Sequence, residues 1–319
     1  MKSGVARMGR LVAAAVAAAL LVVLLAAAGP SLLLAWIERD AFVTPPPGTL
    51  TPDALGAPSR QLSFASGDRT LRASFVPVAD PRAPALLVFH GNDEELSRWA
   101  AVQQRLHTAG IASFVFDYSG YGASSGRPGV ARLRQDGLAA YQRFVALTPQ
   151  AARRVALGFS LGSAVLLDVA GALRPAPDGI VVGAGFASAR EMAVATGVVP
   201  GWAAWALPDV WNGEARLREP GKALPLLIVH GTRDEVVPVE HAFRLCEAAR
   251  GPRRLVLLDG LSHDAPLLLR EAEAFWQPVI GFVRSGASVP AAGSQGSACR
   301  RRTVPPASAS ASASSEGRP

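Results

Sequence analysis

The central part of the chain alternates between short, continuously apolar runs and longer segments with helical character. Apolar runs of this kind predict strands, and because their apolarity is continuous rather than alternating, both faces of each strand are expected to be buried. The predicted strands are residues 84–90, 112–118, 153–159, 178–184, 224–230 and 253–259. The predicted helices are residues 95–108, 131–147, 162–173, 239–249 and 268–284. This order predicts an α/β fold with a mostly parallel central sheet flanked by helices.

Residues 60–78 lie before this alternation and predict an antiparallel hairpin that turns at residues 66–68. We expect the hairpin to form one edge of the sheet. Residues 60–285 are then predicted to be a single domain, because a chain of this length can bury one large core. A Pro-rich linker is predicted before the domain at residues 44–59, and a disordered tail rich in Ala, Ser, Pro and Gly is predicted after it at residues 286–319.

An uncharged apolar run occupies residues 11–28 and follows three basic residues, which is typical of a membrane-insertion signal. Apolar residues 32–37 continue after a short break, and cleavage near Ala28 would leave them exposed. We therefore expect residues 1–43 to be a cytoplasmic N-terminus with an uncleaved transmembrane anchor; a secreted protein cleaved near Ala28 is the alternative. Because basic residues before a span stay in the cytoplasm, the large domain is expected in the periplasm, on the outer side of a bacterial-type inner membrane.

The net charge of +7 gives no indication of nucleic-acid binding. Six basic residues lie near the two ends of the chain: Lys2, Arg7, Arg10, Arg300, Arg301 and Arg302. The central part has no basic stripe with interleaved aromatic residues, so no nucleic-acid partner is expected.

The chain has two cysteines, Cys246 in a predicted helix and Cys299 in the predicted tail. They support neither a disulfide framework nor a zinc site, and Cys246 is expected to be a small buried apolar residue. Residues 180–192 imitate the G-x-G-x-x-G pattern of dinucleotide-binding turns, but Ser188 stands at the third glycine position and no carboxylate ends a strand about 20 residues later. The sequence therefore predicts no cofactor and no metal ion.

Two segments match the G-x-S-x-G pattern of a nucleophilic serine, residues 158–162 and residues 122–126. Such a serine needs a strand directly before its turn and a helix directly after it. Ser160, in the first segment, lies between a predicted strand and a predicted helix. Ser124, in the second, is followed by residues 127–129, Arg-Pro-Gly, where no helix can begin at once. Ser160 is the predicted nucleophile, and Ser124 is predicted to be a loop residue.

A serine hydroxyl is a weak nucleophile and needs a base, which is in turn oriented by an acid. His241 lies early in a predicted helix, whereas His263 lies in a polar loop after the last predicted strand, and this position favours His263 as the base. Two acids end neighbouring strands: Asp234, and Asp259, four residues before His263. Both remain candidates on the residues alone, and the usual chain order in folds of this type favours Asp234.

Attack on an acyl group also requires two N–H donors for the oxyanion that develops. Leu161 would open the helix after Ser160, so its backbone N–H is one predicted donor. Asn92 follows His90 and Gly91 at the end of the first predicted parallel strand, and its backbone N–H is the other. His90 is expected to hold the loop that carries Asn92.

The segments LVFHGN, FDYSGYGASSG, GFSLG and LIVHGTRDEVVP and the loop with His263 occur in this order within residues 60–284. With these motifs the chain resembles the α/β-hydrolase superfamily, and within it membrane-anchored bacterial hydrolases of the serine aminopeptidase-like or esterase-like kind. The resemblance implies the α/β-hydrolase fold and a set of site residues. They are Ser160 as nucleophile, Asp234 as acid, His263 as base, and Asn92 and Leu161 as oxyanion-hole residues.

The resemblance also implies that Asp117 and Tyr121, in the D-Y-x-G-Y-G segment, line one side of the substrate pocket. The chain departs from the superfamily pattern at Ser163, where a second glycine is common, and at Asp93, where a small residue is usual. A carboxylate at position 93 would disfavour anionic acyl groups if it pointed inward.

Residues 187–222 form an insert between two predicted strands that carries Met192, Trp202, Trp205 and Trp211. Such an insert is typical of a small helical lid over a site, in which case Trp202 and Trp205 would belong to the substrate pocket and the substrate would be apolar. The alternative is that the tryptophans only pack the insert onto the sheet.

These residues predict a serine hydrolase that cleaves an ester or related acyl bond through an acyl-enzyme intermediate, as a carboxylesterase or lipase-like enzyme with an apolar acyl substrate. A peptidase or a thioesterase would use the same residues. The alternative from another class is a catalytically silent protein of this fold that acts as a membrane-tethered binding protein. A complete set of serine, acid and histidine disfavours it, because a strained turn is costly to keep without use.

Overall fold

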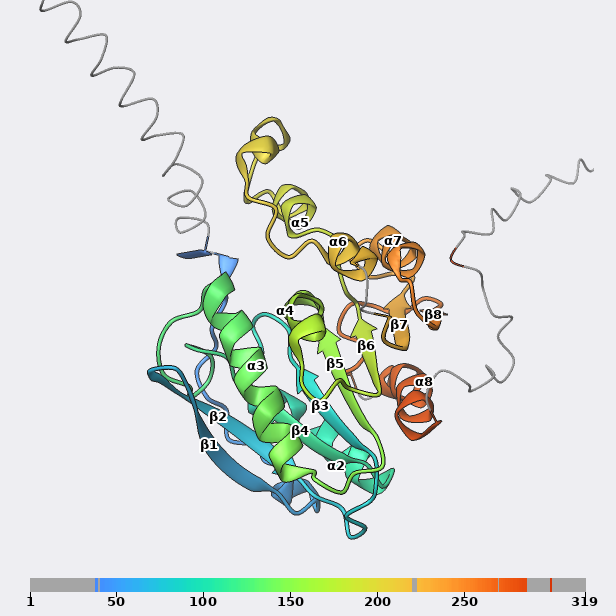
Figure 1. The fold of residues 1–319 in the computed structure, drawn as a ribbon. Helices are drawn as coiled ribbons and strands as arrows, with labels where there is room; N and C mark the ends of the chain where they lie inside the picture. The colour runs from blue at the N-terminus through green and yellow to red at the C-terminus, as the bar shows by residue number, and fades with distance from the viewer. Residues whose placement is uncertain (1–37, 40, 220–222, 269, 286–298, 300–319) are drawn as a thin grey trace, which may run out of the picture.

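The computed structural model describes residues 38–39, 41–219, 223–268, 270–285 and 299. Its centre is an eight-stranded sheet with the strand order β1-β2-β4-β3-β5-β6-β7-β8 (Figure 1). The strands are β1 Arg60–Ser66, β2 Arg69–Val76, β3 Ala85–Phe89, β4 Ala112–Phe116, β5 Arg154–Phe159, β6 Gly179–Gly183, β7 Leu226–Gly231 and β8 Arg253–Leu258. β1 and β2 pair antiparallel with their neighbours, and all strands from β4 onward in this order run parallel. The predicted mostly parallel sheet with a hairpin at one edge is confirmed.

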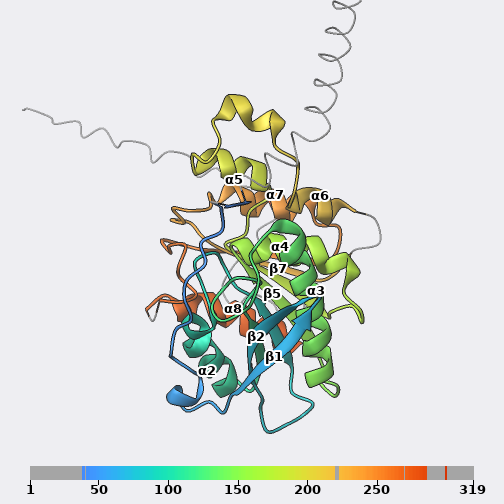
Figure 2. The same cartoon turned by 90° about the vertical axis from the view of Figure 1, so that its left-hand side faces the viewer.

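Helices cover both faces of the sheet (Figures 1 and 2). They are α2 Ala100–Thr108, α3 Val130–Leu147, α4 Leu161–Val169, α5 Ala189–Ala195, α6 Gly213–Arg218, α7 Glu240–Ala248 and α8 Ala272–Ser285. α3, α4 and α7 contribute to the core on one face, which includes Phe114, whereas α2 and α8 contribute to the core on the other, which includes Val115. Successive strand residues point to opposite faces, so the continuous apolar runs fill both cores.

Short 3-10 helices complete the fold: η1 Asp53–Leu55, η2 Leu96–Trp99, η3 Ala170–Ala172 and η4 Gly201–Ala206. The predicted helix 95–108 is thus divided into η2 and α2, and the predicted helix 162–173 into α4 and η3. Between β6 and β7 the chain leaves the layered body, and η4 is the described element that projects furthest from the sheet in both views (Figures 1 and 2). α5, η4 and α6 form the predicted helical lid insert, of which residues 220–222 lie outside the described residues.

In the described part of the chain, no helix has the length and apolar character needed to cross a bilayer. The predicted anchor at residues 11–28 lies outside the described residues, and so does the predicted tail apart from Cys299.

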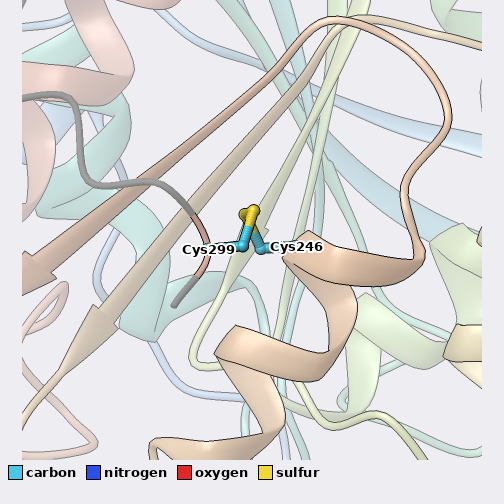
Figure 3. Close-up of a disulfide and its surroundings, with 2 residues drawn as sticks. All are labelled: Cys246 and Cys299. Atoms are coloured by element: carbon cyan, nitrogen blue, oxygen red, sulfur yellow. A yellow bond between two sulfur atoms is a disulfide. The ribbon is translucent and has the colours of Figure 1, made fainter. Parts of the chain in front are cut away.

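Cys246, on α7, forms a disulfide with Cys299 (Figure 3). Cys246 is buried as expected, but the expectation that the two cysteines form no disulfide is wrong. The two residues are 53 positions apart, and their pairing depends on where the chain returns in space, which the spacing does not reveal. The disulfide links the chain beyond α8 to α7.

Candidate active site

Ser160 occupies a sharp turn between β5 and α4, with φ of 50° and ψ of −118°. A positive φ is unfavourable for a residue with a Cβ, so the surrounding contacts must hold the turn. The Ser160 N–H donates to the carbonyl of Gly183 at 3.0 Å. A Cβ on Gly158 would lie 2.5 Å from the carbonyl oxygen of Gly162, and a Cβ on Gly162 would overlap the carbonyl oxygen of Phe89. The two glycines of the motif are therefore required by close backbone packing.

We expect Gly162→Ala to lower the free energy of unfolding by about 3 kcal/mol, because the added methyl group overlaps rigid backbone rather than a flexible side chain. Gly281→Ala in α8 is the matched control, since a Cβ there has no neighbour within 4 Å, and it should leave stability equal or slightly higher. Urea denaturation measures both values. Equal stabilities for the two variants would contradict the prediction.

His263 lies in the loop after β8 and contacts both Ser160 and Asp234. Its Nε2 lies 3.1 Å from Oγ of Ser160, and its Nδ1 lies 2.8 Å from Oδ2 of Asp234. The ring of Phe159 packs against the imidazole at a centroid distance of 5.2 Å. Because an ionised carboxylate only accepts, Nδ1 carries the proton and Nε2 is left to accept from the Ser160 hydroxyl. A general base needs this arrangement.

Asp234 lies in the loop after β7, and its side chain is fully buried. Its Oδ1 accepts from the N–H groups of Val236 and Val237 at 2.9 and 2.7 Å. Its Oδ2 lies 3.3 Å from Nε2 of His230, which is also 2.9 Å from the carbonyl of Val237. Burial opposes ionisation, but the hydrogen bonds from His230, His263 and the backbone outweigh it and hold the pKa of Asp234 well below its ordinary value. The buried carboxylate is therefore kept as an anion.

The alternative candidates occupy other environments. Asp259 accepts a hydrogen bond from the hydroxyl of Thr232 at 3.1 Å. His241 accepts from a backbone N–H at 3.2 Å, and Ser124 ties its loop to the backbone beside β2 and β4. Within the described residues, none of these three side chains is hydrogen bonded to His263. The structure thus brings together Ser160, Asp234 and His263, and it leaves the alternatives apart from them.

Burial lowers the pKa of His263, but the hydrogen bond and the negative charge of Asp234 outweigh it, and the net pKa lies above the ordinary 6.5. Only the neutral imidazole can accept a proton, so we expect kcat/KM to rise with pH and to reach half of its plateau above pH 6.5. Asp234→Asn removes the negative charge, so the midpoint should move to lower pH. A pH profile on a neutral ester measures both midpoints, and a wild-type midpoint at or below 6.5 would count against the prediction.

Asn92 and Leu161 border the same cavity as Ser160. Leu161 is the first residue of α4, so its N–H has no carbonyl partner inside the helix. Asn92 follows β3 and Gly91. Across residues 41–219 and the other described segments, neither N–H donates to a protein acceptor. Both remain available to an oxygen of a bound substrate, as an oxyanion hole requires.

Glu94 is buried under the loop that carries Asn92. Its carboxylate accepts from the N–H of Gly91 at 2.6 Å and from Nε1 of Trp99 at 2.9 Å, and burial raises its pKa. On the other side of the loop, His90 Nδ1 donates to the carbonyl of Gly91 at 2.8 Å, which is the expected structural role of His90. Sequence reasoning did not identify this role of Glu94, because an acidic residue in a polar loop is usually solvated.

A strap, residues 41–45, crosses this loop before the chain enters the domain. Nδ2 of Asn92 donates to the carbonyl of Ala41 at 3.0 Å, and Oδ1 of Asn92 accepts from the N–H of Val43 at 3.0 Å. Val43 also accepts from the N–H of Asp93 through its carbonyl at 3.0 Å. The side chain of Asn92 therefore binds the strap, and the same residue borders the cavity. Sequence reasoning assigned this segment only as the end of the anchor and the start of a linker.

A cavity of about 260 Å³ opens beside Ser160. Its lining is mostly apolar and includes Phe42, Phe186, Met192, Val198, Leu207 and Trp211. Phe42 of the strap packs edge-on against Trp211 of the insert, with ring centroids 6.0 Å apart. Of the described residues, two that line the cavity are charged, and both bind backbone: Glu38 accepts from the N–H of Val130 at 2.7 Å, and Arg190 donates to the carbonyl of Leu207 at 2.6 Å. The cavity is suited to an apolar group.

The four predicted pocket residues do not line this cavity. Tyr121 is buried behind Asn92, whose Oδ1 accepts from its hydroxyl at 2.6 Å, and Asp117 is buried 3.4 Å from Nε2 of His90. Trp202 and Trp205 are 81 % and 82 % exposed, so the prediction that they form the pocket wall is corrected. The insert folds so that Met192 and Trp211 turn inward, while η4 turns its tryptophans to the outside.

The chain is similar in sequence to a known protein family and to bacterial proteins. Residues 80–213 match the family model described as serine aminopeptidase, S33. The uncharacterized protein YfhR of Escherichia coli K12 is 29 % identical over 242 residues, which cover 73 % of this chain and 83 % of YfhR.

Solved structures resemble the chain in fold. The Pyrococcus furiosus esterase Pf2001 superposes with a TM-score of 0.60 at 21 % identity, over 76 % of this chain and 97 % of the esterase. Mouse alpha/beta hydrolase domain-containing protein 10 superposes with a TM-score of 0.54 at 20 % identity, over 71 % and 97 %. The family match supports a hydrolase. The observed sheet and the likeness to these solved structures show that the chain has the α/β-hydrolase fold.

Proposed function

We propose that the protein is a serine hydrolase that cleaves an ester or a related acyl bond through an acyl-enzyme intermediate. The observation that carries this proposal is the hydrogen-bonded series from Ser160 through His263 to Asp234, with contacts of 3.1 and 2.8 Å, at the edge of an apolar cavity. The esterases among the structural neighbours support the same reaction class.

In the proposed mechanism, Oγ of Ser160 attacks the acyl carbonyl carbon while Nε2 of His263 takes its proton. The oxyanion accepts hydrogen bonds from the N–H groups of Asn92 and Leu161. The intermediate expels the alcohol, which takes the proton back from Nε2. His263 then deprotonates a water molecule, which attacks the acyl-enzyme, releases the acid and restores the Ser160 hydroxyl. Asp234 orients the imidazole throughout and stabilises its protonated form.

The substrate class that fits the cavity is a neutral, apolar acyl ester. Asp93, whose carboxylate would disfavour anionic acyl groups if it pointed inward, is exposed and is absent from the lining. Peptide-bond cleavage is the second candidate, because the matching family model is described as serine aminopeptidase. Rates on p-nitrophenyl esters and on aminoacyl p-nitroanilides distinguish the two.

The test of the reaction class is labelling with a fluorophosphonate probe. Wild-type protein should be labelled and Ser160→Ala should not, because the probe reacts only with an activated serine. Ser124→Ala is the matched control from the other G-x-S-x-G segment and should retain labelling. Labelling of Ser160→Ala, or no labelling of the wild type together with no ester hydrolysis, would overturn the proposal and favour a silent binding protein.

The acyl group is expected to extend along α5, on which Ala193 lines the cavity. Ala193→Phe should lower kcat/KM for p-nitrophenyl octanoate by about tenfold and leave p-nitrophenyl acetate nearly unchanged, because the ring fills space that only the longer chain needs. Ala195→Phe is the matched control, since Ala195 lies on the same helix but is exposed. Equal losses on both esters would argue against this acyl path.

For location, we propose a membrane anchor in the N-terminal part of residues 1–43, before Glu38, because Glu38 and residues 41–43 contact the domain. The hydrolase domain is then on the extracytoplasmic side, with secretion after cleavage near Ala28 as the alternative. The Cys246–Cys299 disulfide supports an oxidising compartment. Protease digestion of intact spheroplasts should degrade the domain of the full chain, and protection until lysis would place it in the cytoplasm instead.

A further inference from the structure

The outermost part of the insert exposes an apolar surface of unusual composition. We call residues 198–207 the lid tip; it contains η4 and carries Trp202 and Trp205, which are 81 % and 82 % exposed, and Val198, which is 41 % exposed. The other tryptophans of the described residues, Trp99, Trp211 and Trp276, are all buried. No charged residue occurs from residue 192 to residue 208. Two indole rings exposed to water are unfavourable, and such a patch indicates a surface that contacts something apolar.

The lid tip is also part of the cavity rim. Val198 and Leu207, at its two ends, both line the cavity, whereas the tryptophans between them do not. Figures 1 and 2 both place η4 furthest from the sheet, beyond α5. A flat apolar phase that met the lid tip would therefore lie directly at the opening of the cavity.

The N-terminal side of the chain reaches the same rim. Glu38, Ala41 and Phe42 line the same cavity, and the strap is fixed to Asn92 by two hydrogen bonds. Only residues 29–37 separate Glu38 from the uncharged run 11–28. Nine residues span at most about 30 Å, so a bilayer that holds this run must lie close to the cavity opening.

We propose that the lid tip inserts Trp202 and Trp205 into the interface of a lipid bilayer, so that the cavity takes its acyl substrate from that bilayer. Tryptophan is enriched at membrane interfaces, where its ring lies in an apolar region and its N–H remains near water. The absence of charge along residues 192–208 allows insertion without removing an ion from water. The docking stands by itself, and its consequence for the substrate rests on the proposed function.

The first measurement is fluorescence quenching of the full chain, carrying Ser160→Ala, in vesicles of phosphatidylethanolamine and phosphatidylglycerol. The fluorescence of Trp202 and Trp205 is obtained as the difference in tryptophan emission between this protein and the same protein with Trp202→Phe and Trp205→Phe. We expect dibrominated acyl chains to lower that difference at least twofold, because bromine quenches only nearby indoles. An equal difference in brominated and plain vesicles would overturn the docking.

The second measurement compares two substrates in the same vesicles with an active chain. The double variant Trp202→Ser/Trp205→Ser should hydrolyse a long-chain ester embedded in the bilayer at least tenfold more slowly than wild type and leave a water-soluble p-nitrophenyl ester unchanged. The control Leu50→Ser/Leu55→Ser changes two exposed apolar residues outside the insert and should alter neither rate.

The two hypotheses fail in different ways. Quenching without hydrolysis of any ester would leave the docking standing and remove the proposed function. Hydrolysis of the soluble ester without quenching would remove the docking alone. A wild-type dimer that the double variant dissociates, without quenching, would identify the lid tip as a contact between two copies of the chain and overturn the proposal.

Discussion

Ser160→Ala is expected to lower kcat/KM for a short p-nitrophenyl ester by about 10⁴-fold or more. The remaining catalysis would come only from substrate binding in the cavity and from the oxyanion donors. The variant removes the atom that would form the acyl-enzyme. It leaves the N–H groups of Asn92 and Leu161 in place, so a small residual rate over water is expected. Stopped-flow or steady-state release of p-nitrophenol measures the effect.

The fold should survive this change. Among the described residues, Oγ of Ser160 makes one hydrogen bond, at 3.1 Å to His263. An alanine can occupy the same backbone conformation at the same strain. The melting temperature of Ser160→Ala is therefore the control, and it should stay close to that of the wild type. If the variant is folded and its rate is nearly unchanged, Ser160 is not the nucleophile and another residue must have this role.

The sheet and the proximity of Ser160, Asp234 and His263 could be predicted, because both follow from the positions of the strands in the sequence. Phe114 and Val115 belong to cores on opposite faces of β4, so a continuous apolar run correctly indicated burial on both sides. In a parallel sheet the carboxyl ends of the strands share one edge, which brings the loops after β5, β7 and β8 together. Ser160, Asp234 and His263 lie in these loops.

The cavity walls could not be predicted because they belong to segments without strand periodicity. The sequence marks Trp202, Trp205 and Trp211 as equally apolar, but only Trp211, with φ of 51°, turns into the cavity. The contribution of Phe42 was not predicted for another reason. Its segment has the composition of a linker, and the contacts that hold it come from residues distant in sequence, Asn92, Asp93 and Trp211. The Cys246–Cys299 disulfide could not be predicted for the same reason, because it joins segments that are far apart in sequence.

The strap connects two parts of the proposed site. Asn92 holds the strap by its side chain and is predicted to hold the oxyanion by its backbone. Glu94 and His90 fix the same loop through Gly91. Substitutions in residues 41–43 are thus expected to alter both the shape of the cavity and the orientation of one oxyanion donor, although this segment lies outside the sheet.

Asp234→Asn is expected to lower kcat by about 10⁴-fold. An amide can turn its NH₂ group toward Nδ1 of His263, which then accepts and leaves the proton on Nε2, where it can no longer take the proton of Ser160. The variant also removes the charge that stabilises the protonated imidazole during the reaction. Steady-state kinetics on a short ester, at a pH above the wild-type midpoint, separate this loss from a change in protonation.

Asp259→Asn is the matched variant, because Asp259 was the other acid left open by the sequence and the same atoms are exchanged. Its Oδ1 accepts only from Thr232 at 3.1 Å among its described side-chain contacts, and an amide oxygen can accept the same bond. Its kcat should stay within about twofold of the wild type, since a surface hydrogen bond of this kind is worth little. A large loss in Asp259→Asn with an active Asp234→Asn would transfer the orienting role to Asp259, and the 2.8 Å contact between Asp234 and His263 would then be structural.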